Sequence, residues 1–127
     1  MERASLTIYS LDGPSPVLSL DVARSPSQQA RGLMYVQKLP PNHGMLFVFP
    51  DEQPRSFWMR NTLVSLDQIF LDSAGYVVDV NECATPLSET SYVSKQPARY
   101  VVECPCGTVA MYDLRIGDGV HLEFYGS

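Results

Sequence analysis

The chain has 127 residues, a net charge of −5 and a pI near 4.8, with nine Lys and Arg against 14 Asp and Glu. This length fits one domain spanning residues 1–127, long enough to bury a core without a metal or disulfide framework. The basic residues form no run, which argues against nucleic-acid binding and against docking on an anionic membrane. No apolar stretch approaches the length of a bilayer span, so we expect no membrane insertion.

The first half of the chain predicts three strands and one helix. Ser5–Ser10 and Val17–Val22 carry alternating apolar residues, which indicates half-buried strands. Ser25 followed by proline is a typical helix start, so a helix should run from there to about Met34. Met45–Phe49 is a short apolar run bounded by glycine and proline, which predicts a strand buried on both faces. The helix should bury three side chains: Ala30, Leu33 and Met34.

The second half predicts more strands, a second short helix and a long loop. Gly75 lies in a short connection that predicts a β-hairpin. Thr85–Pro97 is rich in Ser, Thr and Pro without periodicity, which indicates a loop longer than usual. Pro105–Leu114 has room for a short helix. The predicted strands are Arg55–Asn61, Asp67–Asp72, Tyr76–Val80, Ala98–Cys104 and Val120–Tyr125.

Together these elements predict a mainly β domain. Several connections are too short for a parallel crossover, so the pairing should be mostly antiparallel. We therefore expect an antiparallel β-barrel-like or sandwich domain with about eight short strands and two short helices.

The three cysteines are Cys83, Cys104 and Cys106. An odd count does not suggest a closed disulfide framework, so we expect reduced, partly buried thiols. A pair between Cys83 and either Cys104 or Cys106 is the alternative for an exported protein. No signal peptide is visible after Met1, which predicts a cytoplasmic protein, or an exported one (periplasmic or extracellular) if a signal has been removed.

Three segments carry a family resemblance: Arg31–Met34, Gly44–Phe49 and Pro54–Thr62 resemble the family catalogued as domain of unknown function 192. The resemblance covers about residues 16–122, and it implies a compact bacterial or archaeal β-rich domain, sometimes carried behind an export signal. It implies no reaction, cofactor or substrate, so no catalytic residue is carried over. Shorter matches continue in order at Leu66–Asp67, Phe70–Asp72, Tyr100–Glu103 and Ile116–Asp118.

Three residues depart from the pattern that the resemblance implies. Gln68 stands where an aliphatic residue is expected, which puts the burial of its strand in doubt. Gly119 replaces a common basic residue, and Cys106 replaces a usual alanine. None of the three changes the expected fold.

The segment from Arg55 to Asp67 is the strongest candidate for a binding site. Trp58 supplies an apolar wall, and the forked guanidinium of Arg55 suits a carboxylate or phosphate. Another interpretation is a core strand and turn, with Arg55 paired to Asp67 or Glu103, Asn61 closing an Asx-turn, and Arg31 capping a helix. The full candidate set is Arg31, Met34, Arg55, Trp58, Met59, Asn61, Thr62, Asp67 and Glu103.

The leading functional hypothesis is non-enzymatic binding of a small polar or anionic ligand, a carboxylate or a saccharide-like molecule, around Arg55, Trp58, Asn61 and Asp67. The alternatives are a hydrolase that uses two carboxylates and a protein-interaction module that uses the Thr85–Pro97 loop or an open sheet edge. We expect no cofactor and no metal, because the histidines and cysteines show no ligand spacing. The sequence predicts no oligomeric state and no catalytic residue. The acidic candidates are Asp67, Asp72, Asp79, Glu82 and Glu103.

Overall fold

The computed structural model describes residues 1–126 and confirms a mainly β fold with two short helices. The helices are α1 (Pro26–Arg31) and α2 (Thr108–Met111). The strands are β1 (Arg3–Ser10), β2 (Gly13–Pro14), β3 (Leu18–Ala23), β4 (His43–Gln53), β5 (Ser56–Phe57), β6 (Leu66–Leu71), β7 (Val77–Ala84), β8 (Tyr92–Val93), β9 (Ala98–Pro105) and β10 (Gly119–Tyr125).

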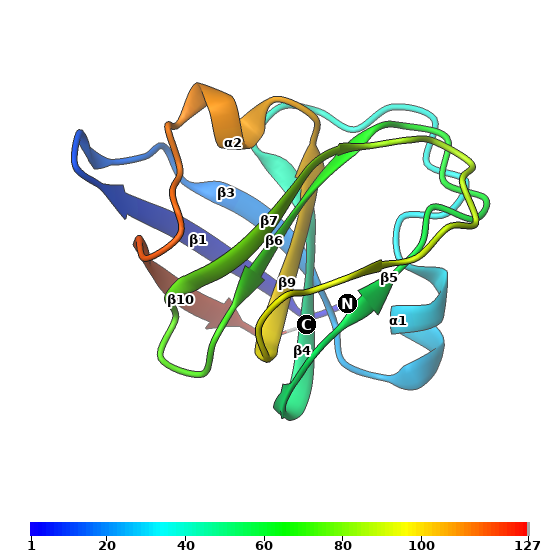
Figure 1. Cartoon of the computed structure of the whole chain (residues 1–127), viewed down its shortest axis with the longest axis horizontal. Coiled ribbons are helices and arrows are strands. Elements are labelled where there is room, and N and C mark those ends of the chain that lie inside the picture. The colour runs from blue at the N-terminus through cyan, green and yellow to red at the C-terminus, as the bar shows by residue number, and fades with distance from the viewer. Residues whose placement is uncertain (127) are drawn as a thin grey trace.

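The main sheet has the order β10-β1-β3-β4-β9-β6-β7, with β2 paired to β1. Its pairs are antiparallel except β3–β4, which is parallel because the crossover through α1 returns the chain in the same direction. The sheet curls until its two edge strands approach at a bridge between Tyr76 and Gly119 (Figure 1). Strands β5 and β8 form a separate two-stranded sheet beside α1.

The predicted strand Arg55–Asn61 is wrong in its length. Only Ser56–Phe57 pairs as a strand, and the Thr62 N–H then donates to the Met59 carbonyl at 3.1 Å. This bond closes a turn in which Asn61 has a φ of 55°, a left-handed conformation that asparagine tolerates better than most residues. The chain therefore turns where the apolar run suggested a continuous strand.

The predicted loop Thr85–Pro97 contains the short strand β8. The Asp79 carboxylate, buried in β7, accepts hydrogen bonds from the Tyr92 hydroxyl at 2.7 Å and the Lys95 N–H at 3.0 Å. Burial and this carboxylate raise the pKa of Tyr92 to about 12, so its proton stays on the donor. Asp79 thereby holds the loop against the sheet.

Helix α1 begins as predicted. Ser25 accepts from the Gln28 N–H at 3.1 Å, and the Gln28 side chain accepts from the Ser25 N–H, which completes a capping box. The helix ends before Gly32, and none of its residues is buried. The predicted burial of Ala30 is therefore wrong, whereas Leu33, just beyond the helix, is 7% exposed.

The core forms two clusters on opposite faces of β4, β6 and β9, because successive side chains of a strand point to opposite sides of the sheet. The first contains the alternating residues of β1 and β3, such as Leu6 and Leu20, and confirms the predicted alternation. The second contains an aromatic series in which Phe57 lies 4.9 Å from Phe47 and 6.1 Å from Phe70 between ring centres. Each fully buried side chain of this size stabilises the fold by about 1.5–3 kcal/mol. In residues 1–126, no helix is long and apolar enough to cross a membrane.

The expectation of three reduced thiols is wrong. Cys83 and Cys106 form a disulfide, and Cys104 is the free, buried cysteine of residues 1–126. The ends of β7 and β9 flank β6, which brings the two cysteines together at one end of the sheet. The bond accounts for one departure from the family pattern, because Cys106 is a disulfide partner instead of a small packing residue.

Candidate functional site

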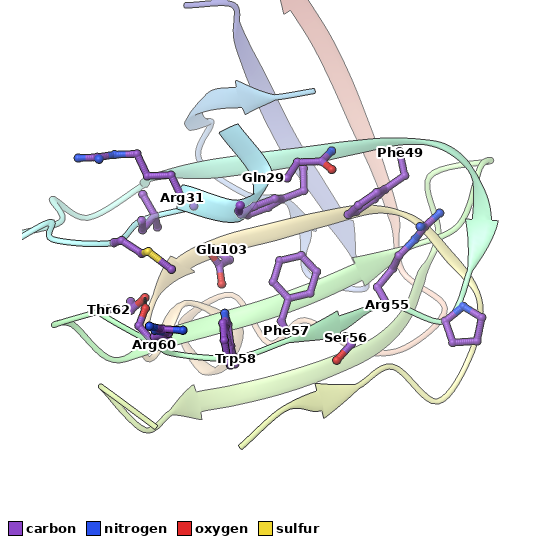
Figure 2. Close-up of a pocket in the computed structure, with 16 residues that line it drawn as sticks. Gln29, Arg31, Phe49, Arg55, Ser56, Phe57, Trp58, Arg60, Thr62 and Glu103 are labelled. Atoms are coloured by element: carbon purple, nitrogen blue, oxygen red, sulfur yellow. Dashed lines mark hydrogen bonds between the residues drawn. The ribbon is translucent and has the colours of Figure 1, made fainter. Parts of the chain in front are cut away.

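A pocket of about 370 Å³ opens between α1, β4 and the β5 segment, and we call it the Glu103 pocket. Figure 2 shows its lining, with Glu103 pointing into the middle from β9. The volume lies in the range of small-molecule sites. Six of the predicted site residues line it: Arg31, Met34, Arg55, Trp58, Thr62 and Glu103.

Glu103 is the carboxyl group at the base of the pocket. It is 4% exposed, and its Oε2 accepts from Gln68 Nε2 at 3.0 Å. Burial raises its pKa to about 7, and the Gln68 hydrogen bond opposes that rise only in part. Near neutral pH, Glu103 is therefore able both to donate and to accept a hydrogen bond.

The second oxygen of Glu103 is free for a ligand. Within residues 1–126, no group donates a hydrogen bond to Oε1, and no fully buried side-chain polar atom lacks a partner. Oε1 therefore keeps some access from the pocket. Gly32 leaves this space open, because a Cβ there would lie 3.6 Å from Oε1 and 3.4 Å from the Phe47 ring. With φ at 51° and ψ at −130°, Gly32 has a backbone conformation essentially limited to glycine.

Aromatic rings form the walls. Phe47 and Phe57 pack edge to face, and Trp58 is 42% exposed at the mouth. A large aromatic ring left this exposed beside a hollow offers apolar contact area to a bound molecule. The walls are therefore apolar, with the Glu103 carboxyl group between them.

Two arginines stand at the mouth. Arg31 points outward at the rim in Figure 2, and the Arg60 guanidinium lies 5.4 Å from the Trp58 ring. Neither has a carboxylate within ion-pair distance among residues 1–126. The mouth is therefore positive, although the whole chain carries a net charge of −5.

Arg55 lines the pocket, but the protein itself occupies its head group. Nε donates to the Ala98 carbonyl at 2.8 Å, one terminal nitrogen pairs with Asp51 at 2.9 Å, and the guanidinium lies 3.9 Å above the Phe49 ring. The alternative pairing with Asp67 or Glu103 is wrong, since Asp51 takes that place. Arg55 therefore contributes its side-chain stem to the pocket more than a free charge.

Three predicted residues lie outside the pocket. Asp67 is fully buried near the start of β6, where it accepts from the Cys83 and Val109 N–H groups. Met59 is buried behind the pocket, and the Asn61 carbonyl accepts from the Tyr35 N–H at 2.9 Å. No Asx-turn hydrogen bond forms at Asn61, which shapes the turn through its backbone.

The lining residues that were not predicted include Phe47, Phe49, Phe57 and Arg60. Arg60 belongs to the segment already singled out, and its charge was the available signal. Gln68, which also departs from the family pattern, is 1% exposed and bridges Glu103 to Asn81 through its two amide atoms. A glutamine among the apolar residues of this strand was the signal that a buried polar partner exists.

A family model described as Uncharacterized ACR, the domain of unknown function 192 family, matches residues 8–122. The match begins upstream of Pro16, where the resemblance in the sequence was expected to begin. The segments that carried the resemblance, Arg31–Met34 and Pro54–Thr62, supply much of the pocket lining.

Curated relatives of archaeal origin are named UPF0127 protein. One from Thermococcus sibiricus is 37% identical over 95 residues, covering 73% of this chain and 58% of that protein. Another from Thermococcus gammatolerans is 39% identical over 90 residues, covering 69% of this chain and 56% of that protein. The matching part of the chain thus spans little more than half the length of these relatives.

Solved structures share the fold closely. A putative transcription regulator from Sinorhizobium meliloti superposes with a TM-score of 0.90 at 35% identity, covering 94% of this chain and 92% of that chain. A protein of unknown function from Novosphingobium aromaticivorans superposes with a TM-score of 0.87 at 32% sequence identity, covering 92% of this chain and 83% of that chain.

Proposed function

We propose that this chain, which belongs to the domain of unknown function 192 family, binds a small organic carboxylate in the Glu103 pocket. The family is one of unknown function, so the proposal rests on the chemistry of the pocket. One observation carries it: an open pocket joins a buried carboxyl group with a free oxygen to two arginines that have no acidic partner within residues 1–126.

The charge at the mouth favours an anion. Arg31 and Arg60 present guanidinium groups that form charge-assisted hydrogen bonds to carboxylates, often in pairs. Since no side-chain carboxylate among the described residues pairs with either arginine, binding need not break an existing ion pair. An anionic group on the ligand should therefore lie at the rim.

The interior favours a polar group on an apolar body. Trp58 and Phe57 supply ring surface, and Glu103 Oε1 supplies a hydrogen-bonding atom below them. A carboxylate whose other end carries a hydroxyl or keto group satisfies both parts, because protonated Glu103 donates to a keto oxygen and ionised Glu103 accepts from a hydroxyl. The ligand class is therefore a small hydroxy- or keto-carboxylate with an apolar middle.

The lining supports binding better than hydrolysis. Among the described residues, Glu103 is the one carboxyl group that lines the Glu103 pocket. A carboxylate-dependent hydrolase needs two such groups across the scissile bond. Asp67 and Asp79 already hold backbone and loop groups elsewhere.

The test is thermal unfolding of the full chain with a panel of small hydroxy- and keto-carboxylates and matched uncharged amides. A carboxylate at about 100 times its Kd should stabilise the protein by about 2.7 kcal/mol, or about 10 °C for this length. Arg60→Ala and Arg31→Ala should reduce the shift. Arg115→Ala, which removes an exposed arginine outside the pocket, should retain it.

The same panel contains the outcome that would refute the proposal. If no carboxylate raises the melting temperature more than its matched amide, the pocket does not select an anion. Equal shifts in Arg60→Ala and Arg115→Ala would place any binding outside this pocket.

A further inference from the structure

The Cys83–Cys106 disulfide lies at the surface, away from the Glu103 pocket. Both cysteines are exposed. Cys83 is near the end of β7, and Cys106 follows β9 directly. Exposed disulfides are more open to attack by thiols than buried structural ones.

The backbone at Cys83 is irregular. The register between β6 and β7 shifts between Leu66 and Gln68, which leaves a bulge opposite Asp67. Cys83 lies in this bulge with a φ of 50°, a left-handed conformation that is uncommon for residues other than glycine and asparagine. Bulges of this kind aim a side chain away from the regular ladder and often occur beside functional sites.

A buried carboxylate lies beneath the disulfide. A side-chain oxygen of Asp67 and the two sulfur atoms all lie within 4.8 Å of one another. Asp67 Oδ1 accepts from the Cys83 N–H at 2.8 Å, and Oδ2 accepts from the Val109 N–H at 2.9 Å. The bulge is thus held by Asp67 as well as by the disulfide.

A second hollow of about 360 Å³ reaches one of the two sulfur-bearing residues, and we call it the Cys83 groove. Cys83 lines it and Cys106 does not. The same groove is lined by Ser88, Thr90 and Ser91, which carry hydroxyl groups, by the amide residue Asn81 and by the acidic residue Glu82. These groups suit the amides, carboxylates and ammonium of a short peptide.

We propose that the Cys83 groove seats a small peptide thiol, which exchanges with the Cys83–Cys106 disulfide by attack on Cys83. The thiolate forms a new sulfur–sulfur bond with Cys83 Sγ while the bond to Cys106 breaks. The released Cys106 thiolate takes up the proton that the attacking thiol lost. A second peptide thiol then attacks the peptide sulfur of the mixed disulfide, which leaves both cysteines reduced and the peptide oxidised to its dimer, a balanced transfer of two electrons.

Cys104 takes no part in this exchange. Its side chain is buried, and burial raises its pKa to about 12, which keeps it a thiol. A Cys104→Ala chain therefore keeps the reactive pair and simplifies the thiol count.

The test uses the full chain with Cys104→Ala, incubated with reduced and oxidised glutathione, quenched with an alkylating reagent and measured by intact mass. In the folded protein, the Cys83–Cys106 disulfide should exchange with reduced glutathione. With oxidised glutathione, a Cys106→Ala chain should form the mixed disulfide at Cys83 severalfold faster than a Cys83→Ala chain forms it at Cys106. Circular dichroism establishes that each variant is folded.

A groove variant separates seating from simple exposure. Ser91→Trp should slow the reaction with glutathione and leave the reaction with dithiothreitol much less affected, whereas Gln37→Trp, exposed and outside both hollows, should slow neither. The proposal would be overturned if the mixed disulfide with glutathione formed at the same rate at Cys83 and at Cys106. It would also be overturned if Ser91→Trp did not change the rate of the reaction with glutathione. A disulfide that glutathione reduces only after unfolding in urea would overturn it as well.

Discussion

Replacing Glu103 with glutamine should change how the stability of the protein depends on pH. The carboxyl group is buried in the folded chain, where its pKa is about 7, against an ordinary value of 4.5. Between these pH values the folded state keeps a proton that the unfolded chain has lost, so the free energy of unfolding falls as pH rises. The whole difference is worth about 3 kcal/mol, at about 1.4 kcal/mol per pH unit.

Glu103→Gln cannot ionise, so it removes the fall in the free energy of unfolding with rising pH. Its side-chain carbonyl oxygen can still accept the hydrogen bond from Gln68 Nε2. At pH 8 the variant should therefore be more stable than the parent by up to about 3 kcal/mol, or about 10 °C for a chain of this length. Below pH 4.5 the advantage should vanish, because the parent's carboxyl group is then protonated in both states.

Urea unfolding of the parent and Glu103→Gln chains from pH 4 to pH 8.5 measures this difference. Glu89→Gln is the matched control, since it removes an exposed carboxyl group and should follow the parent at every pH. Parallel curves for the parent and Glu103→Gln between pH 5 and pH 8 would refute the reasoning, and the buried carboxyl group would then not be the source of the pH dependence.

Two further substitutions test how the site is held. Gly44→Ala should destabilise the fold by about 3 kcal/mol in urea unfolding, because its Cβ would lie 2.1 Å from the Glu103 carbonyl oxygen and force β4 away from β9; a loss under about 1 kcal/mol would contradict that contact. Asp67→Asn should cost about 1–3 kcal/mol, since its amide nitrogen leaves the N–H of Cys83 or Val109 without an acceptor. Faster hydrogen exchange at one of those two amides would identify the lost bond, and unchanged exchange at both would count against it.

Local patterns predicted most of the elements. The alternation in Val17–Val22 and the Ser25 cap each act over a few residues, and the structure confirms both. The resemblance to the family identified the segments that line the Glu103 pocket. These signals depend on the order of neighbouring residues, which a sequence states directly.

Long-range partners were harder to predict. The run from Arg55 to Asn61 has the composition of a strand, yet the Thr62–Met59 hydrogen bond turns the chain after a paired strand of two residues. The partner of Arg55 was missed although it is near in sequence: Asp51 lies four residues earlier, at the end of β4, and the turn into β5 brings the two side chains together. The pairing of Cys83 with Cys106 likewise depends on where β7 and β9 end in the sheet, which no spacing rule contains.

The pairing of β1 with β10 has a consequence for folding. Arg3 lies opposite Tyr125, so hydrogen bonds join the first strand to the last across almost the whole chain. Closing so long a loop delays the final contacts, and β-rich domains of this kind fold in about milliseconds to seconds. A chain emerging from the ribosome would hold β1 with one bare edge until β10 has been synthesised, and during that interval this edge can pair with the edge of another unfinished copy.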